Sequence, residues 1–150
     1  MALYYLETSA LVKLYVREQG TDRLLELAAR ANENRLAILA LARVEFRSAV
    51  RRRERNGEIA ARIAVQLLEL FQKHLEVRFL TQPINDFVLD MADGLVDRYA
   101  LRAFDAVQLA GFLAFQNSAG SDLPTFVCAD AGLLSAAIQE GCNTLDPCSG

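Results

Sequence analysis

The sequence has few of the residues on which disulfide frameworks, zinc sites and histidine-based catalysis depend. Its three cysteines are an odd number and show no C-x-x-C spacing, so neither a disulfide framework nor a zinc site is indicated. We expect Cys128 and Cys142 to be buried, inert thiols. The only histidine, His74, lies in a polar stretch with no nucleophile motif nearby. A Ser-His-Asp or Cys-His mechanism would therefore depend on that single residue.

Long apolar runs, linkers and phosphate-binding loops are also absent from the sequence. The longest apolar run, from Leu36 to Ala42, is far too short to span a membrane, and Met1 to Leu6 lacks the basic region of a signal peptide. No stretch rich in Ser, Gly or Pro divides the chain, and no G-x-x-x-x-G-K motif occurs. We therefore expect one domain over residues 1–150, in a cytoplasmic protein that does not contact a membrane.

Short apolar runs alternate with amphipathic stretches along the whole chain. The runs predict strands at 3–6, 36–39, 76–80, 125–129 and 143–145. The amphipathic stretches predict helices at 9–16, from Thr21 onward, and at 43–55, 58–75, about 83–97, 103–116 and 133–140. Strands separated by helices indicate an α/β fold with a mostly parallel central sheet and helices on both faces. Ligands bind to such sheets at the carboxyl ends of the strands.

Four acidic residues stand in unusually apolar stretches. Glu7 and Asp130 each follow a short apolar strand, and Glu45 and Asp105 each lie near the start of a helix. Parallel strands would bring Glu7 and Asp130 to the same edge of the sheet, and helix N-termini favour anions. Four carboxylates in one cleft repel each other unless cations hold them, and an all-oxygen donor set suits Mg²⁺ or Mn²⁺ better than zinc. The four acids together predict a site for one of these two metals.

Each acid also has a simpler interpretation. A single carboxylate in such a position is more often a helix cap or a surface group than a metal ligand. Only the joint placement of the four favours the metal site, and the residues alone leave both interpretations open. A further acidic face, formed by Asp90, Asp93 and Asp97, is interpreted as solvated, with a supporting role near the metals as the alternative.

Basic residues are in the minority, but several gather on one predicted helix. The chain carries 16 Lys and Arg against 19 Asp and Glu, a formal net charge of −3. Arginines recur every four residues on the helix that carries Glu45, and another lies beside Asp105. They are candidates for contacts with RNA phosphates, while a solvated face or a surface for an acidic partner is the alternative. The candidates are Arg43, Arg47, Arg51 and Arg102, with Arg52, Arg53 and Arg55 nearby.

Four segments resemble, in order, the motifs of PIN domains. The segment "YYLETSALVKLYVREQG" is similar to the family's opening strand and helix, and "LARVEFRSAVRR" to its second acidic element. The segment "LRAFDAVQLA" resembles the family's third acidic element, and "TFVCADAGLLSAAIQEG" resembles its last. The resemblance covers essentially the whole chain, which looks like the small bacterial toxins of the VapC type, the ribonuclease partners in toxin–antitoxin pairs. It implies a single PIN-like α/β domain.

The resemblance also implies an activity and partners. It implies a divalent-metal-dependent endoribonuclease, the toxin of a bacterial type II toxin–antitoxin pair, which hydrolyses RNA phosphodiester bonds with a metal-activated water. Glu7, Glu45, Asp105 and Asp130 take the places of the family's catalytic, metal-binding acids, with Mg²⁺ or Mn²⁺ as cofactor. Thr8 takes the place of the hydroxyl residue that supports the site. The implied partners are RNA, a cognate antitoxin and a second copy of the chain in a homodimer.

One residue departs from the family pattern. The first acid is usually Asp, and the added methylene of Glu7 moves the carboxylate outward by about 1.5 Å. Mg²⁺ requires near-ideal octahedral geometry, so the site is either weakened or adapted by a rotamer shift, a bridging water or a preference for Mn²⁺. The alternative to a nuclease is therefore a catalytically weakened PIN-fold module that binds RNA or an antitoxin without efficient cleavage. A phosphotransfer enzyme acting on a phosphomonoester is disfavoured by the missing Gly-rich loop.

Overall fold

Five strands and seven helices make up the part of the chain that the structure, a computed structural model, describes, namely residues 1–120 and 122–149. The strands are β1 (Ala2–Leu6), β2 (Asn34–Leu39), β3 (Phe79–Gln82), β4 (Thr125–Val127) and β5 (Thr144–Leu145). The helices are α1 (Thr8–Lys13), α2 (Thr21–Ala29), α3 (Ala42–Arg55), α4 (Ala61–Val77), α5 (Asp86–Arg98), α6 (Ala103–Ser118) and α7 (Ala131–Gln139).

The strands form one sheet in the order β3-β2-β1-β4-β5, and all four neighbouring pairs are parallel. In the central pairing Tyr4 lies opposite Thr125 and Leu6 opposite Val127. The ends of β1 and β4 therefore meet at one edge of the sheet, and the chain enters a helix directly after each of them. This arrangement confirms the α/β fold with a parallel sheet that the sequence predicts.

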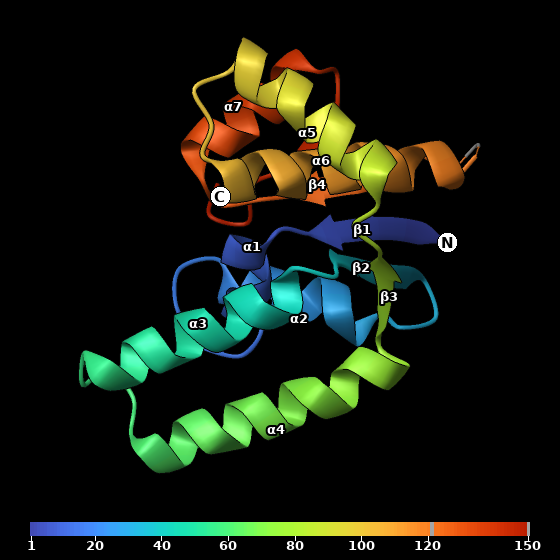
Figure 1. The fold of residues 1–150 in the computed structure, drawn as a ribbon. Helices are drawn as coiled ribbons and strands as arrows, with labels where there is room; N and C mark the ends of the chain where they lie inside the picture. Colours follow the sequence, from blue (N-terminus) through green and yellow to red (C-terminus); the bar gives the residue numbers. More distant parts are fainter. Residues whose placement is uncertain (121, 150) are drawn as a thin grey trace.

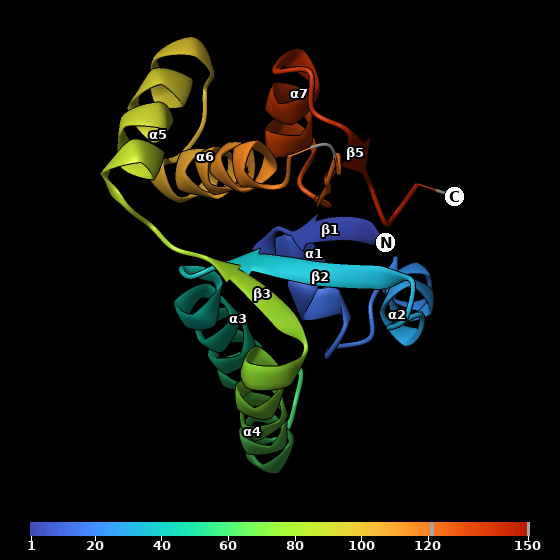
Figure 2. The same cartoon turned by 90° about the vertical axis from the view of Figure 1, so that its right-hand side faces the viewer.

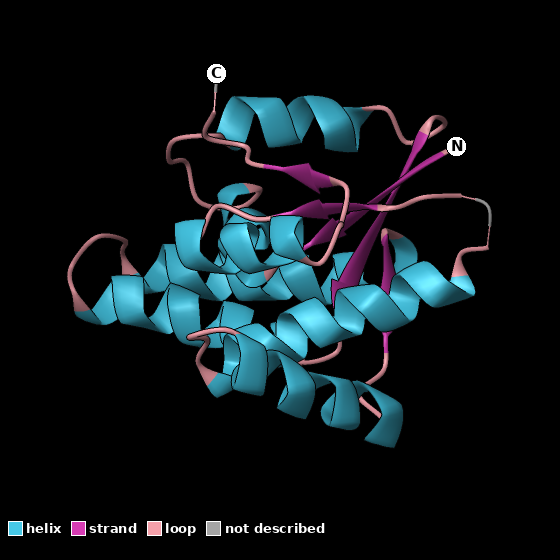
Figure 3. Ribbon diagram, turned by 90° about the horizontal axis from the view of Figure 1, so that it is seen from above, coloured by secondary structure: helices cyan, strands magenta, loops and turns pink. Residues whose placement is uncertain are grey.

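Helices cover both faces of the sheet, as Figures 1 and 2 show. Helices α1 to α4 lie on one face and α5 to α7 on the other. Figure 3 shows the strands and the surrounding helices from above. Successive residues of a strand point to opposite faces, so Tyr5 is buried against the α5–α7 layer and Leu6 against the α1–α4 layer. Each layer has its own buried core, with Phe112 and Phe126 in one and Phe46 and Phe71 in the other.

The main difference from the expected elements lies at the end of α4. The apolar run at 76–80 predicts a strand there, but α4 continues to Val77 and β3 begins only at Phe79. Val77 is 75% exposed, so it is not part of a buried strand. Helix α1 is shorter than predicted, because the chain turns after Lys13 and Tyr15 packs edge-on against Phe46.

The cysteines are free, and only one of the two predicted buried thiols is fully buried. Cys128 is buried, whereas Cys142 is only half-buried. Burial raises the pKa of the Cys142 thiol to about 11 and raises the pKa of Cys128 further, so both thiols stay protonated at neutral pH. Within residues 1–120 and 122–149, none of the helices has the length and apolar character needed to cross a membrane.

Candidate active site

Each of the four acids predicted as site residues lies at or near the N-terminus of a helix. Glu7 follows β1 and caps α1, and Asp130 follows β4 and caps α7. Glu45 and Asp105 lie in the first turns of α3 and α6. Because β1 and β4 are parallel neighbours, Glu7 and Asp130 leave the sheet at the same edge.

All four carboxylates and Thr8 line one cleft of about 640 Å³. Lys13, Arg52, Arg53 and Arg102 add positive charge to its walls. At one side Glu18 forms salt bridges with both Lys13 and Arg53, with N···O distances of 3.2 and 3.1 Å. The cleft therefore combines a row of acids with a basic margin.

Glu7 is the most deeply buried of these acids, with 5% of its surface exposed. Its Oε2 accepts hydrogen bonds from the Ser9 amide at 2.9 Å, from the Ser9 hydroxyl and from the Cys128 thiol at 3.5 Å. Burial raises the pKa of Glu7 above its usual value, although the hydrogen bonds from Ser9 act in the opposite direction. Glu7 is therefore anchored through one oxygen at the floor of the cleft.

Glu45 is held through one oxygen by two donors from other elements. The Thr8 hydroxyl donates to Oε1 of Glu45 at 2.8 Å, and Nε2 of Gln108 donates to the same oxygen at 2.6 Å. Nε2 of Gln108 also donates to the Thr8 hydroxyl at 2.9 Å. Thr8, Glu45 and Gln108 thus form a closed triangle that joins α1, α3 and α6.

The two aspartates make fewer contacts with the protein. Oδ1 of Asp130 accepts from the amide of Leu133 at 2.9 Å, the usual bond of a helix-capping aspartate. Oδ2 of Asp105 accepts from Nε of Arg102 at 3.2 Å, and the Arg102 side chain is 82% exposed. An ion pair this exposed contributes little to stability, so Asp105 can exchange it for another cation at small cost.

The donor chemistry of the cleft fits a hard divalent cation. Each of the four carboxylates has one oxygen that accepts a hydrogen bond, and the residues described by the structure supply no donor to the other. Oxygen-only sets of this kind suit Mg²⁺ or Mn²⁺. In the side-chain arrangement described for residues 1–120 and 122–149, however, no three Asp, Glu, His or Cys groups are already placed to hold a metal ion. The acids share a cleft without forming a closed coordination shell.

The candidate arginines divide between two grooves. Arg102 lines the acidic cleft, but Arg43, Arg47 and Arg51 do not. Since successive residues of a helix are 100° apart, Arg43 and Arg47 point away from Glu45 on α3. Arg51 instead pairs with Glu54 at 2.9 Å. Of the four candidate arginines, only Arg102 therefore lies beside the acids, and the role of the others in RNA binding stays a prediction.

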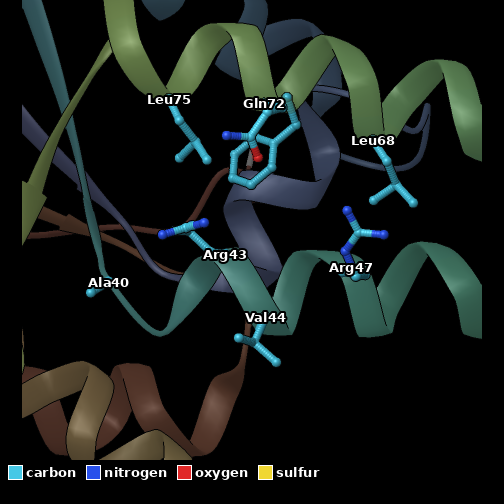
Figure 4. A pocket seen from close by; sticks show the side chains of 8 residues that line it. Ala40, Arg43, Val44, Arg47, Leu68, Gln72 and Leu75 are labelled. Carbon is cyan, nitrogen blue, oxygen red and sulfur yellow. The ribbon is translucent and has the colours of Figure 1, made fainter.

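Arg43 and Arg47 lie in a second groove of about 220 Å³ between α3 and α4. Figure 4 shows both side chains extending from α3 toward α4, with Arg43 on the side of Leu75 and Gln72 and Arg47 on the side of Leu68. Neither arginine has an acidic partner among the described residues. Val44 lines both this groove and the acidic cleft, so the two are neighbours.

The other polar residues singled out in the sequence lie elsewhere. Asp90, Asp93 and Asp97 are exposed on α5 and do not line the cleft, in agreement with a solvated face. Nδ1 of His74 shares a hydrogen bond of 2.7 Å with the Tyr15 hydroxyl, between α4 and the turn after α1. His74 thus has a structural contact away from the acids.

Besides Lys13 and Glu18, three further residues at or near the cleft have side chains suited to a role there and were not predicted as site residues. Ser9 binds Glu7, Gln108 binds Glu45, and Phe104 lines the cleft with 62% of its surface exposed. The sequence contained a signal for Gln108, which is the one polar residue in the apolar run "AVQLAGF" and follows Asp105 by three positions. Phe104 gave no such signal, because an aromatic residue beside an apolar run is ordinary.

The comparisons with known proteins agree with the fold. A family model described as "PIN domain" matches residues 4–113. Ribonuclease VapC46 of Mycobacterium tuberculosis (strain ATCC 25618 / H37Rv) is 36% identical over 110 residues, which cover 73% of this chain and 74% of that protein.

Solved structures with low sequence identity share the fold. VapBC2 from Rickettsia felis, crystallised bound to a DNA fragment from its promoter, has a TM-score of 0.63 at 14% identity, covering 95% of this chain and 97% of that one. PAE2754 from Pyrobaculum aerophilum has a TM-score of 0.62 at 21% identity, with 95% and 89% covered. FitAcB from Neisseria gonorrhoeae has a TM-score of 0.58 at 17% identity, with 98% of both chains covered.

Proposed function

Because this chain belongs to the PIN domain family, we propose that it is a divalent-metal-dependent endoribonuclease, the toxin of a bacterial type II toxin–antitoxin pair. The observation that carries the proposal is the single cleft that Glu7, Glu45, Asp105 and Asp130 all line at the carboxyl edge of the sheet. The similarity to a protein named ribonuclease VapC46 supports RNA as the substrate. The reaction would be hydrolysis of a phosphodiester bond by water.

The four acids would hold Mg²⁺ or Mn²⁺ through the oxygens to which the described residues donate no hydrogen bond. When bound, such an ion stabilises negative charge on a phosphate and makes water more acidic. The chain's own part is to hold the acids in place before the substrate arrives. Ser9 anchors Glu7, and Thr8 with Gln108 anchors Glu45. Fixed groups of this kind avoid reorganisation during the reaction.

The margin of the cleft offers contacts for a single RNA strand. Arg102 is exposed and can leave Asp105 to bind a phosphate, and Arg52 lines the same cleft. The exposed ring of Phe104 lines the same cleft and can stack on a base. Across Val44, the groove with Arg43 and Arg47 would continue the path for the strand. Local positive charge of this kind permits RNA binding despite the net charge of −3.

We also propose a cytoplasmic protein with an antitoxin as partner and a homodimeric form. The name VapBC2 denotes a pair of components that share a promoter, and the likeness of that structure to this chain supports a partner here as well. An apolar groove of about 180 Å³ between α2 and α4, lined by Leu14, Tyr15, Leu25, Leu67 and Leu70 among others, is suited to an apolar side chain of a partner segment. Leu11 and Leu24 on α1 and α2 are buried in the core and do not contribute to this groove.

The test is cleavage of a mixed pool of structured and unstructured RNAs by the purified protein in EDTA, Mg²⁺ or Mn²⁺. The proposal predicts cleavage only with metal, and loss of cleavage in Asp105→Asn. The matched control is Asp97→Asn, which removes the same charge from an exposed position on α5 and should retain activity. Cleavage that persists in EDTA or in Asp105→Asn would refute the proposed mechanism.

A catalytically weakened module that binds RNA or an antitoxin is the second candidate. It is favoured by Glu7 in place of the usual Asp and by the lack of a closed coordination shell in the described arrangement of the acids. Binding of RNA without cleavage in either metal, by a folded protein, would select this candidate.

A further inference from the structure

Gln108 is a fully buried polar residue on the otherwise apolar inner face of α6. Its buried neighbours on the same helix include Ala106, Leu109 and Phe112, which pack into the core. A leucine at position 108 would suit this environment, so packing alone gives no reason for an amide. The reason has to be sought in the polar contacts of the side chain.

Those contacts are all directed at the acidic cleft. Nε2 of Gln108 donates to Oε1 of Glu45 and to the hydroxyl of Thr8, and both acceptors line the cleft. Oε1 of Gln108 is buried and has no hydrogen-bond partner among the residues that the structure describes. Buried polar atoms without a partner are rare in folded proteins and are costly.

A rotation of the Gln108 side-chain amide that exchanges its oxygen and its NH₂ group would not remove the cost of the unpaired oxygen. The reversed orientation would place the amide oxygen of Gln108 against the carboxylate oxygen of Glu45, and both are hydrogen-bond acceptors. The protein therefore keeps an unpaired carbonyl so that the NH₂ group can hold Glu45 and Thr8. A buried group kept at the expense of stability is typical of functional sites.

Backbone contacts fix the position of Gln108 as well. The hydroxyl of Tyr5 on β1 donates to the backbone oxygen of Gln108 at 3.2 Å. Gly111, one turn later, has no side chain that would separate α6 from Tyr5 and Leu39. The amide is thus carried on a helix that is held closely against the sheet.

We propose that Gln108 is a positioning residue that, together with Thr8, fixes one oxygen of Glu45 and leaves the other available to a cation in the cleft. This inference rests on the proposed nuclease function. It adds Gln108 to the proposed site as a fifth residue beside the four acids. Gln108 acts through Glu45 and does not touch the substrate. Groups that orient metal ligands in this way typically affect metal affinity or activity by about 10- to 100-fold.

The test compares Gln108→Leu with the wild type in three measurements. These are the midpoint of thermal unfolding in EDTA, the Mn²⁺ dissociation constant by calorimetry, and kcat and KM for RNA cleavage. We expect a midpoint that is unchanged or raised, Mn²⁺ affinity lower by about 10-fold or more, and a lower kcat with little change in KM. Gln116→Leu, the same exchange on α6 at a position that does not line the cleft, should change none of them.

A double variant separates positioning from a loss of folding. Thr8→Val removes the second donor to the same oxygen of Glu45, so its effect on Mn²⁺ affinity should not add to that of Gln108→Leu. If Gln108→Leu does not fold, Gln108→Asn supplies a shorter amide that should give the same loss of affinity. Additive effects, or Mn²⁺ affinity and kcat within twofold of wild type, would overturn the inference. A wild type that neither binds Mn²⁺ nor cuts RNA would instead overturn the proposed function, and the inference with it.

Discussion

Replacement of Gly111 by alanine should destabilise the protein, although alanine is the better helix former. Gly111 lies in α6, at a point where that helix packs closely against the sheet. A Cβ atom at this position would collide with Cδ1 of Leu39 and would lie 2.7 Å from the hydroxyl oxygen of Tyr5. Both neighbours are completely buried, so neither can move aside freely.

The size of the effect follows from three contributions. Overpacking a core by one methyl group costs about 1–3 kcal/mol. Displacement of the Tyr5 hydroxyl from the backbone oxygen of Gln108 costs about 1 kcal/mol more. Alanine has a higher helix propensity than glycine, which stabilises the folded protein by about 1 kcal/mol and offsets part of this cost. The free energy of unfolding should therefore fall by about 1–3 kcal/mol, and Tm by about 2–4 °C for each kcal/mol.

Gly94 on α5 provides the matched control. A Cβ atom there would meet only the end of the flexible Arg98 side chain, at 3.2 Å, so Gly94→Ala should stabilise the protein by about 0.5–1 kcal/mol. Urea unfolding followed by circular dichroism measures both variants. If Gly111→Ala is as stable as Gly94→Ala, α6 does not approach the sheet closely enough for a methyl group to be excluded.

Three further predictions concern the cleft. Burial raises the pKa of Glu7 above its value in the unfolded chain, so the ionised form of Glu7 opposes folding at neutral pH. In EDTA, Glu7→Gln should therefore unfold at a higher urea concentration than wild type at about pH 7–8, and at the same urea concentration at about pH 4. A difference that does not change with pH would contradict this assignment. Glu7→Asp draws the carboxylate back by about 1.5 Å and should raise Mn²⁺ affinity in calorimetry, and unchanged or lower affinity would show that Glu7 is no handicap. Phe104→Ala should weaken RNA binding in fluorescence anisotropy by about 1–3 kcal/mol, whereas truncation of exposed Val96 on α5 to alanine should not; equal effects would exclude stacking on Phe104.

The order of strands and helices could be predicted from the sequence, because local patterns determine it. Alternating apolar runs and amphipathic stretches are short-range signals, and parallel strands with helical connections follow from their order. The end of α4 was predicted wrongly because Glu76 and Val77 fit a strand pattern as well as a helical one. Only the position of β3 beside β2 decides between the two, and that is a tertiary contact.

The position of the acids could also be anticipated, but the way in which they are held could not. Glu7 and Asp130 reach one edge because β1 and β4 are neighbours, and a parallel sheet favours this arrangement from strand ends alone. The contact of Gln108 with Glu45 joins residues 63 positions apart, and no local pattern encodes it. The 100° step between residues of α3 already turns Arg43 away from Glu45, which a count of arginines on the helix does not reveal. That Arg43 faces α4 is a tertiary contact.

The most direct test of the account is anomalous diffraction from crystals of the protein soaked in Mn²⁺. We predict an anomalous peak in the acidic cleft, within coordination distance of Asp105 and Asp130 and of at least one of Glu7 and Glu45. A protein that cuts RNA in Mn²⁺ but shows its only peak outside this cleft, or none at all, would contradict the assignment of the four acids.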